Sequence, residues 1–192
     1  MIFLSASIPA PGREFYGTED VIAIREAIMA FTKVCMENRL SFYFGGHPAI
    51  TPLIWEVAKD YLREEFRPLI RIYQSSYFIG RTPKEVEYFN NVIWTSAKEN
   101  ISESVDYMRE QMFKENNTTI AVFIGGMKGI LAEYGEIRKY YPEALILPIA
   151  TTGAASAELY KDLGLDNQDL YDNYSYVSVF RKYLQGEQSH GT

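Results

Sequence analysis

The sequence predicts an α/β fold in which a parallel sheet of about six strands carries helices on both faces. Short apolar runs alternate with longer segments whose apolar residues recur every three or four positions, which is the helical period. Small or hydrogen-bonding residues follow most of the apolar runs, where the strands of such a sheet would end. Repeated strand-to-helix alternation requires right-handed crossovers and gives a Rossmann-like architecture.

The apolar runs predict the strands. They cover residues 2–7, 40–44, 69–74, 92–94, 119–124 and 145–149, and the fourth is the weakest. The periodic segments predict the helices. They cover residues 18–38, 49–66, a short stretch from residue 82, 102–114, the stretch after Gly126 as far as about Tyr140, a stretch from Ala154, and 168–183.

Two of these elements carry more specific signals. Thr18 is the expected N-cap of the first helix, because a side-chain oxygen there can accept a hydrogen bond from the first turn. The apolar stripe that predicts the buried face of this helix consists of Val21, Ile24, Ile28, Phe31 and Cys35. Pro148 lies near the end of an otherwise central strand, which predicts that the ladder of hydrogen bonds stops there.

One domain is expected at residues 1–184, with a flexible tail at 185–192, because 192 residues suit a single core and the last residues are polar. The formal net charge of -6 and the lack of a basic block argue against long nucleic acid as a partner. No stretch approaches the ~20 apolar residues of a membrane span, and the first apolar run lacks the basic start of a signal peptide. We therefore expect a cytoplasmic protein that does not enter membranes.

Cysteine and histidine are scarce in this chain. It has one cysteine, Cys35, and two histidines, His47 and His190. A single cysteine cannot form an intrachain disulfide, which suits a reducing compartment. This supply is too small for a set of zinc ligands, so no metal and no cofactor are expected.

The residues at five predicted strand ends are candidate ligand-binding groups. They are Ser5, Ser7, Gly45, Gly46, His47, Gln74, Gly125, Gly126, Met127, Thr152 and Gly153. Glycine lets backbone approach a ligand closely, and the helix that follows directs free N–H groups at an anion. Either glycine pair alone is explained equally well as a simple turn. Both pairs together, with Thr152 and Gly153 beside them, favour phosphate binding.

Three charged residues are further candidates, each with a plain alternative. Glu133 follows Gly129 on the same predicted helix and could act as a catalytic carboxylate on a ribose or a glycosidic bond. The alternative is a solvated glutamate that balances the helix dipole. Arg25 and Arg109 lie in amphipathic helices, where each can reach a ligand phosphate or form a surface ion pair. For either arginine taken alone, the ion pair is the expected role.

Several phrases of the sequence resemble a known group of proteins. They are residues 3–9 (FLSASIP), 45–53 (GGHPAITPL), 73–75 (YQS) and 125–133 (GGMKGILAE). Together they resemble the SLOG superfamily, which unites the lysine-decarboxylase-like LOG enzymes, the Smf/DprA proteins and the nucleotide-sensing domains associated with TIR and Sir2 proteins. The resemblance spans roughly residues 2–155 and is most specific in the phrase that begins at Gly45.

The resemblance implies a nucleotide-derived ligand over the strand ends. LOG enzymes cleave nucleoside monophosphates to base and ribose phosphate, and their motif reads Pro-Gly-Gly-x-Gly-Thr-x-x-Glu. In this chain Ile124 replaces the proline, and one additional residue lies between Gly126 and Gly129. Glu133 is therefore offset by one position, about 100° around a helix. The offset favours ligand binding over hydrolysis.

Two functions follow from the resemblance. The first is a cytoplasmic sensor of ADP-ribose or a cyclic ADP-ribose-like signal in bacterial antiphage defence, with a TIR or Sir2 protein as a possible partner. The second is a LOG-like phosphoribohydrolase or N-glycosidase that uses Glu133. The aromatic residues Tyr171, Tyr174, Tyr176 and Phe180 of the last predicted helix, in a chain with 15 tyrosines, also predict a homo-oligomer.

Overall fold

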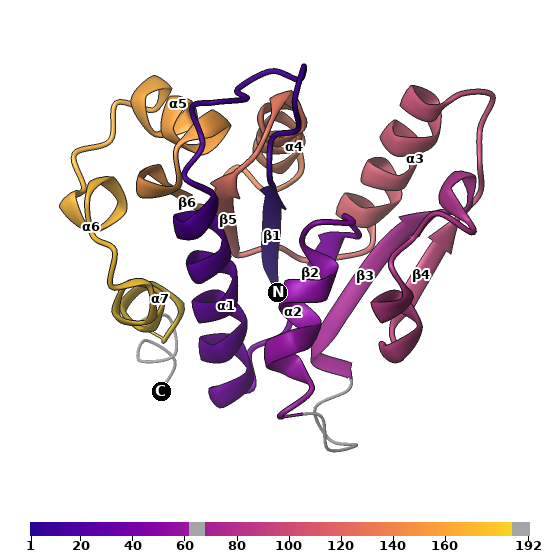
Figure 1. Ribbon diagram of the computed structural model, residues 1–192, viewed down its shortest axis with the longest axis horizontal. Helices are drawn as coiled ribbons and strands as arrows, with labels where there is room; N and C mark the ends of the chain where they lie inside the picture. The colour runs from indigo at the N-terminus through magenta and orange to yellow at the C-terminus, as the bar shows by residue number, and fades with distance from the viewer. Residues whose placement is uncertain (62–67, 186–192) are drawn as a thin grey trace.

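The computed structural model describes residues 1–61 and 68–185 as a sheet between two layers of helices (Figure 1). The strands are β1 (Ile2–Ser7), β2 (Phe42–Gly45), β3 (Ile70–Ser75), β4 (Val92–Thr95), β5 (Ile120–Gly125) and β6 (Leu145–Ile149). The helices are α1 (Val21–Glu37), α2 (Thr51–Ala58), α3 (Ile101–Lys114), α4 (Lys128–Tyr140), α5 (Ala154–Asp162), α6 (Gln168–Tyr171) and α7 (Tyr176–Gln185). Short 3-10 helices are η2 (Ser76–Phe78), η3 (Lys84–Tyr88) and η4 (Ala150–Thr152).

The sheet is parallel throughout, in the order β4-β3-β2-β1-β5-β6. From β1 the chain builds one half of the sheet through β2, β3 and β4, and then crosses to the other side of β1 for β5 and β6. The order therefore reverses between β1 and β5, where Ser7 pairs in register with Gly125. This confirms the predicted Rossmann-like α/β class. It also fixes the expected ligand position, because open α/β sheets bind ligands outside the strand ends at such a reversal.

Side chains alternate along each strand, so the two faces of the sheet have different cores. On one face mostly aliphatic strand residues, with Phe42 and Phe44 of β2, pack against α1, α2 and α7, and the rings of Phe31 and Phe180 join α1 to α7 with centroids 5.5 Å apart. On the other face Phe3, Tyr43 and Phe123 pack against α3, α4 and α5. Figure 1 shows α1 and α2 on the near side of the sheet and α4 on the far side. The helices cover both faces, as the sequence predicts.

Helix α1 starts later than the sequence predicts. Its N-cap is Asp20, whose side chain accepts from the Ala23 N–H at 2.9 Å, and not Thr18. Thr18 instead belongs to the preceding loop, where its hydroxyl donates to the Phe15 carbonyl. Val21 is 41% exposed and is not part of the buried face, whereas the rest of the predicted stripe is buried. The loop is bonded to residues 152–154 just before the helix begins, since the Asp20 N–H donates to the Thr152 carbonyl, and the first helical residue lies outside the core.

Three other expectations change for physical reasons. Strand β6 lies at an edge and is not central, so Pro148 can be accommodated where one side of the strand has no neighbour. The helix predicted at 168–183 is two helices, α6 and α7, separated by a turn in which Asn173 Oδ1 accepts from the Ser175 N–H. The helix predicted at 49–66 ends at Ala58, and its last positions, 62–66, lie outside the described residues. Of the tail predicted at 185–192, Gln185 closes α7 and the others lie outside the described residues.

The described residues also bear on membrane, metal and thiol chemistry. Within residues 1–61 and 68–185, no helix has the length and apolar character needed to cross a membrane. In the same part of the chain, no three His, Cys, Asp or Glu side chains come together as a possible metal site. Cys35 is a free, fully buried cysteine on α1, and burial raises the pKa of its thiol.

Candidate functional site

The glycine turn after β5 lies at the point where the strand order reverses. Gly125 and Gly126 have φ angles of 59° and 91°, a region that glycine adopts without a steric penalty. The Gly125 N–H donates to Thr152 Oγ1 at 2.8 Å, and the Gly126 N–H donates to the Ser7 carbonyl at 2.8 Å. A Cβ at Gly126 would overlap the Ile130 side chain. The turn therefore requires glycine for its own geometry, and it brings four predicted site residues into direct contact.

The glycine turn after β2 also brings predicted residues together, but it uses its backbone groups internally. The Gly46 N–H donates to the Tyr73 carbonyl at 2.8 Å. The Gln74 amide is assigned with its nitrogen facing Gly46, and in this orientation the nitrogen donates to the Gly46 carbonyl at 3.1 Å. A Cβ at Gly45 would lie 3.2 Å from Met108 Cε on α3. The absent side chains at this turn make room for Gln74 and α3.

His47 closes the same turn and satisfies the entry to α2. Its Nδ1 accepts from the Ala49 N–H at 3.2 Å, and its carbonyl accepts from the amides of Ile50 and Thr51, both at 3.0 Å. Burial lowers the pKa of the imidazole, which favours the neutral acceptor form. Pro52 has no N–H to offer. The start of α2 thus leaves few donors for an anion.

Ser5, Arg109 and Glu133 form a cluster of three polar side chains from β1, α3 and α4, called here the charge centre. Ser5 Oγ donates to Glu133 Oε2, and Arg109 Nε donates to Glu133 Oε1 at 3.1 Å. Ser5 is buried, whereas the side chains of Arg109 and Glu133 keep 18% and 16% of their exposure. Arg109 also contacts Asp106 Oδ1 at 3.4 Å. Both oxygens of the predicted catalytic carboxylate therefore already accept hydrogen bonds.

The start of α4 differs from the start of α2. Helix α4 has Met127 at its N-cap and no side-chain cap, whereas α1 and α3 each have one. Among the residues that the structure describes, the amides of Lys128 and Gly129 have no hydrogen-bond acceptor. A Cβ on Gly129 would lie 2.9 Å from an Arg109 guanidinium nitrogen, so the guanidinium lies against the first turn of α4. Open amides and a cation together are the donor set that a phosphate prefers.

In the turn before α5, in contrast, the backbone N–H groups of residues 153–155 already have acceptors. Gly153 has a φ of 67°, and the next amide, that of Ala154, donates to the Thr18 carbonyl at 3.2 Å. The Ala155 N–H lies 3.4 Å from the Gly126 carbonyl. Ala154 and Ala155, which follow Gly153, thus join the β5 turn to the loop before α1. Of the helices that follow glycine turns, α4 offers the most open donors.

Comparison with known proteins agrees with this geometry. The sequence matches the model of the SLOG cluster3 family over residues 14–184. The chain belongs to the SLOG cluster3 family. Three chains of solved structures also match, among them the X-ray structure of TM1055, a Northeast Structural Genomics Consortium target. The TM1055 structure is 14% identical in sequence and has a TM-score of 0.62. The match covers 97% of this chain and 98% of the TM1055 chain, and it supports the fold alone. A search of curated proteins gives no match.

Membership of the SLOG cluster3 family confirms the superfamily that the glycine phrases predict, and it indicates binding or processing of a nucleotide-related ligand. One predicted site residue of this SLOG cluster3 chain lies apart. Arg25 is exposed on α1, and the hydrogen bonds and ion pairs of the described residues do not join it to the other candidates. Three residues of the site are absent from the predicted set, Asp106, Lys128 and Gly129. Gly129 carries a usable signal, because a glycine in a first helical turn costs stability and needs a reason.

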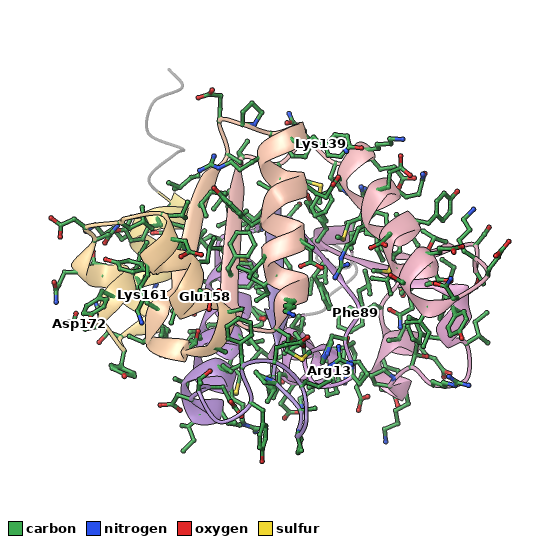
Figure 2. All side chains as sticks on the ribbon, turned by 90° about the horizontal axis from the view of Figure 1, so that it is seen from above. Arg13, Phe89, Lys139, Glu158, Lys161 and Asp172 are labelled. Carbon is green, nitrogen blue, oxygen red and sulfur yellow. The ribbon has the colours of Figure 1, made fainter. Side chains whose placement is uncertain are left out.

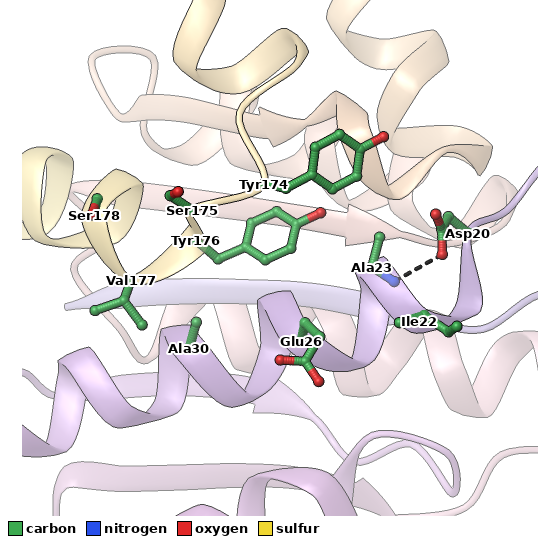
Figure 3. Close-up of a pocket in the computed structure, with 10 residues that line it drawn as sticks. All are labelled: Asp20, Ile22, Ala23, Glu26, Ala30, Tyr174, Ser175, Tyr176, Val177 and Ser178. Atoms are coloured by element: carbon green, nitrogen blue, oxygen red, sulfur yellow. Dashed lines mark hydrogen bonds between the residues drawn. The ribbon is translucent and has the colours of Figure 1, made fainter.

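Among the hollows on the surface of the described residues, three border elements discussed above. The first, of about 350 Å³, lies between α1 and the segment that leads into α7, and Figure 3 shows Tyr174 and Tyr176 there with both hydroxyls toward the Asp20 end of α1. The second, of about 510 Å³, lies between α3 and α4, and Arg109 lines it. The third, of about 490 Å³, lies beyond the end of β6 and includes Gly153. The sequence predicts an oligomer interface, and not a ligand site, at the lining residues Tyr171, Tyr174 and Tyr176.

Proposed function

We propose that this chain binds a nucleotide-derived ligand, of the ADP-ribose or cyclic ADP-ribose type, and senses it without hydrolysing it. The start of α4 carries the proposal. Its open amides at Lys128 and Gly129 and the adjacent Arg109 guanidinium offer several donors to one phosphate. Family membership supports a nucleotide as the source of that phosphate.

The role of Glu133 as an anchor for Arg109 supports sensing over hydrolysis. A general base must accept a proton from water or substrate, and so needs an oxygen within hydrogen-bond reach of that proton. Ser5 and Arg109 already donate to the two oxygens of Glu133. The carboxylate therefore acts as a positioning group that holds Arg109 against the first turn of α4.

A phosphoribohydrolase or N-glycosidase is the second candidate function. One observation favours it: Glu133 and Arg109 retain partial exposure and lie next to the proposed phosphate site. In such an enzyme a bound ligand would displace Ser5 or Arg109 and free one oxygen of Glu133 for acid–base chemistry.

Incubation with ligands separates the two functions. The purified chain is mixed with ADP-ribose, NAD and nucleoside monophosphates, and each mixture is followed by thermal shift and by chromatography of the products. We expect ADP-ribose to raise the melting temperature while the chromatogram stays unchanged. Release of free base would establish the hydrolase, and the absence of any shift would contradict both candidate functions.

We further propose that the chain acts in the cytoplasm, in bacterial antiphage defence, with a TIR or Sir2 protein as its partner. The resemblance of the glycine phrases to the SLOG superfamily, which includes nucleotide-sensing domains associated with TIR and Sir2 proteins, supports this role. Co-purification from the native host, with and without added ADP-ribose, tests it. Recovery of the chain without any TIR or Sir2 protein in both conditions would argue against the partnership.

A homo-oligomer is part of the same proposal. Tyr176 and Phe180 of the predicted interface helix are buried in the chain's own core. The exposed apolar side chains Ile79, Trp94 and Ile101, near the β4 edge of the sheet, support the oligomer instead. Light scattering at micromolar concentration checks it, and a 22.1 kDa particle both with and without ADP-ribose would refute it.

A further inference from the structure

The hollow beyond β6 is lined by residues that have no role in the functions proposed above. It measures about 490 Å³, within the usual size of a small-molecule site, and Gly153, Tyr171 and Tyr174 are among its lining residues. The hollow is adjacent to the Gly125–Gly126 turn. Thr152, which accepts from the Gly125 N–H, lies between two lining residues of the hollow, Thr151 and Gly153.

Two of its tyrosines present aromatic surface to the hollow. Tyr171 and Tyr174 are 54% and 62% exposed, which is unusual for two large rings so close together. Tyr171 packs on Tyr160, another lining residue, with centroids 5.5 Å apart and the rings tilted by 35°. The Tyr160 ring is itself held, because its hydroxyl accepts from the Asn167 N–H at 3.0 Å. A supported ring with an open face is a surface on which a planar group can stack.

The charge of the lining selects the kind of planar group. Glu19, Asp20 and Asp172 contribute three carboxylates, against one cation from Lys161. Figure 2 shows Lys161 and Asp172 at the same end of the molecule. Glu19 Oε2 lies below the surface without a hydrogen bond from any described residue, so a ligand in the hollow meets Glu19 through the exposed part of its side chain. With three carboxylates against one cation, the hollow favours a ligand that brings N–H groups.

We propose that this hollow binds a planar aromatic ring that carries N–H donors, such as an amino-substituted purine base. The ring stacks on Tyr171 and Tyr174, and its amino group donates to the Glu19 carboxylate. The inference rests on the proposed function in one respect: the phosphate of the same ligand would lie at the start of α4. Because Thr152 and Ala155 contact the Gly125–Gly126 turn directly, one nucleotide can reach both places.

Two half-ligands separate this inference from the proposed function. Adenosine carries the ring without a phosphate, and ribose 5-phosphate carries the phosphate without a ring. Their affinities are measured by calorimetry for the parent chain and for Tyr174→Ala, Tyr174→Phe and Glu19→Gln. Tyr88→Ala is the matched control, since it removes another exposed tyrosine ring, on η3, outside the lining of this hollow.

We expect adenosine to bind the parent chain and Tyr174→Ala to weaken that binding at least about fivefold, whereas Tyr174→Phe keeps the ring and most of the affinity. Glu19→Gln should weaken adenosine without lowering the melting temperature, because the lost charge had no partner in the free chain. Inosine, which lacks the amino group, should bind more weakly than adenosine. None of these changes should move the affinity for ribose 5-phosphate.

The outcomes distinguish the two ideas. Binding of ribose 5-phosphate without adenosine, or adenosine binding that Tyr174→Ala and Glu19→Gln leave unchanged, overturns the inference and keeps the proposed function. Binding of adenosine with the expected variants, but no binding of ribose 5-phosphate or ADP-ribose, supports the ring site and overturns the proposed function. If no probe binds, both are wrong.

Discussion

Two polar networks involve the same helix, α3, and each contains an arginine and a glutamate. A comparison of their hydrogen bonds distinguishes residues that stabilise the fold from residues proposed to bind a ligand. The charge centre joins Arg109 directly to Glu133. The second, called here the Asn116 network, lies where α3 ends. There the Tyr73 hydroxyl donates to Glu115 at 2.8 Å, and Asn116 Oδ1 accepts from Arg71 at 2.8 Å.

The Asn116 network fastens the chain to itself. Asn116 also donates to the Met112 carbonyl and to the Tyr73 hydroxyl, so one buried amide fixes the end of α3 against β3. Burial raises the pKa of Tyr73 to about 12, which keeps its hydroxyl protonated and able to donate. The charge centre contains only bonds between side chains and lies beside the open amides of α4. The contrast supports a structural role for the Asn116 network and the proposed ligand role for the charge centre.

The largest effect is expected from Asn116→Ala. This change removes three hydrogen bonds and leaves the Arg71 donor and two buried acceptors, the Met112 carbonyl and the Tyr73 hydroxyl, without them, so the free energy of unfolding should fall by about 3 kcal/mol. Urea denaturation measures it. Asn117→Ala is the matched control, because this neighbouring residue is exposed and its loss should change stability by less than about 0.5 kcal/mol. Equal effects of the two variants would show that the Asn116 network is not a structural anchor.

The next effect concerns ligand affinity. Arg109→Ala removes the cation beside the first turn of α4, and ADP-ribose should bind roughly 10- to 100-fold more weakly, as for loss of a charged hydrogen bond. Calorimetry checks the affinity, and urea denaturation should show a smaller loss of stability than for Asn116→Ala. Arg25→Ala provides the comparison, since Arg25 is exposed and, among the described residues, has no hydrogen bond or ion pair with the charge centre. If the two arginine variants weaken ADP-ribose equally, the phosphate is not bound at α4.

A smaller change in affinity is expected from Glu133→Gln. The amide keeps the size of the side chain but cannot accept from both Ser5 and Arg109, so Arg109 loses part of its positioning. ADP-ribose affinity should fall less than tenfold, and no turnover should be seen before or after the change. If instead the parent chain releases base and Glu133→Gln lowers that rate roughly a hundredfold, Glu133 is catalytic and the sensing proposal is wrong.

The fold could be predicted because its signals are local. Each strand is a short apolar run, each strand end is marked by small residues, and the order of elements then admits few topologies. The site was predictable only as a set of residues. Arg109 and Glu133 are 24 positions apart, and their contact depends on how closely α3 packs over Gly129, which no periodicity reports.

The errors have the same origin. Thr18 reads as an N-cap, but tertiary contacts give its carbonyl to Ala154 and leave the cap to Asp20. Pro148 was interpreted as part of a central strand, because the sequence alone does not reveal that β6 is an edge strand. The hollow beyond β6 was hidden for the same reason: Glu19 and Tyr174 are far apart in sequence and become neighbours only when the sheet is complete.

The smallest effect concerns His47, which lies at the ligand edge but is satisfied by its own backbone, like the Asn116 network. Burial lowers the pKa of its imidazole below the ordinary 6.5, so between these two values the unfolded chain binds more protons than the folded one. Stability should therefore fall as the pH drops from 7.5 through 6.5 to 5.5, and His47→Gln should flatten that dependence. Urea midpoints at the three pH values measure it, with His190→Gln as the control that should follow the parent. The exposed carboxyl groups with lowered pKa values titrate below this window and do not contribute. A His47→Gln curve parallel to that of the parent would mean that the neutral imidazole is not needed for the turn, and His47 would then be free to act on a ligand.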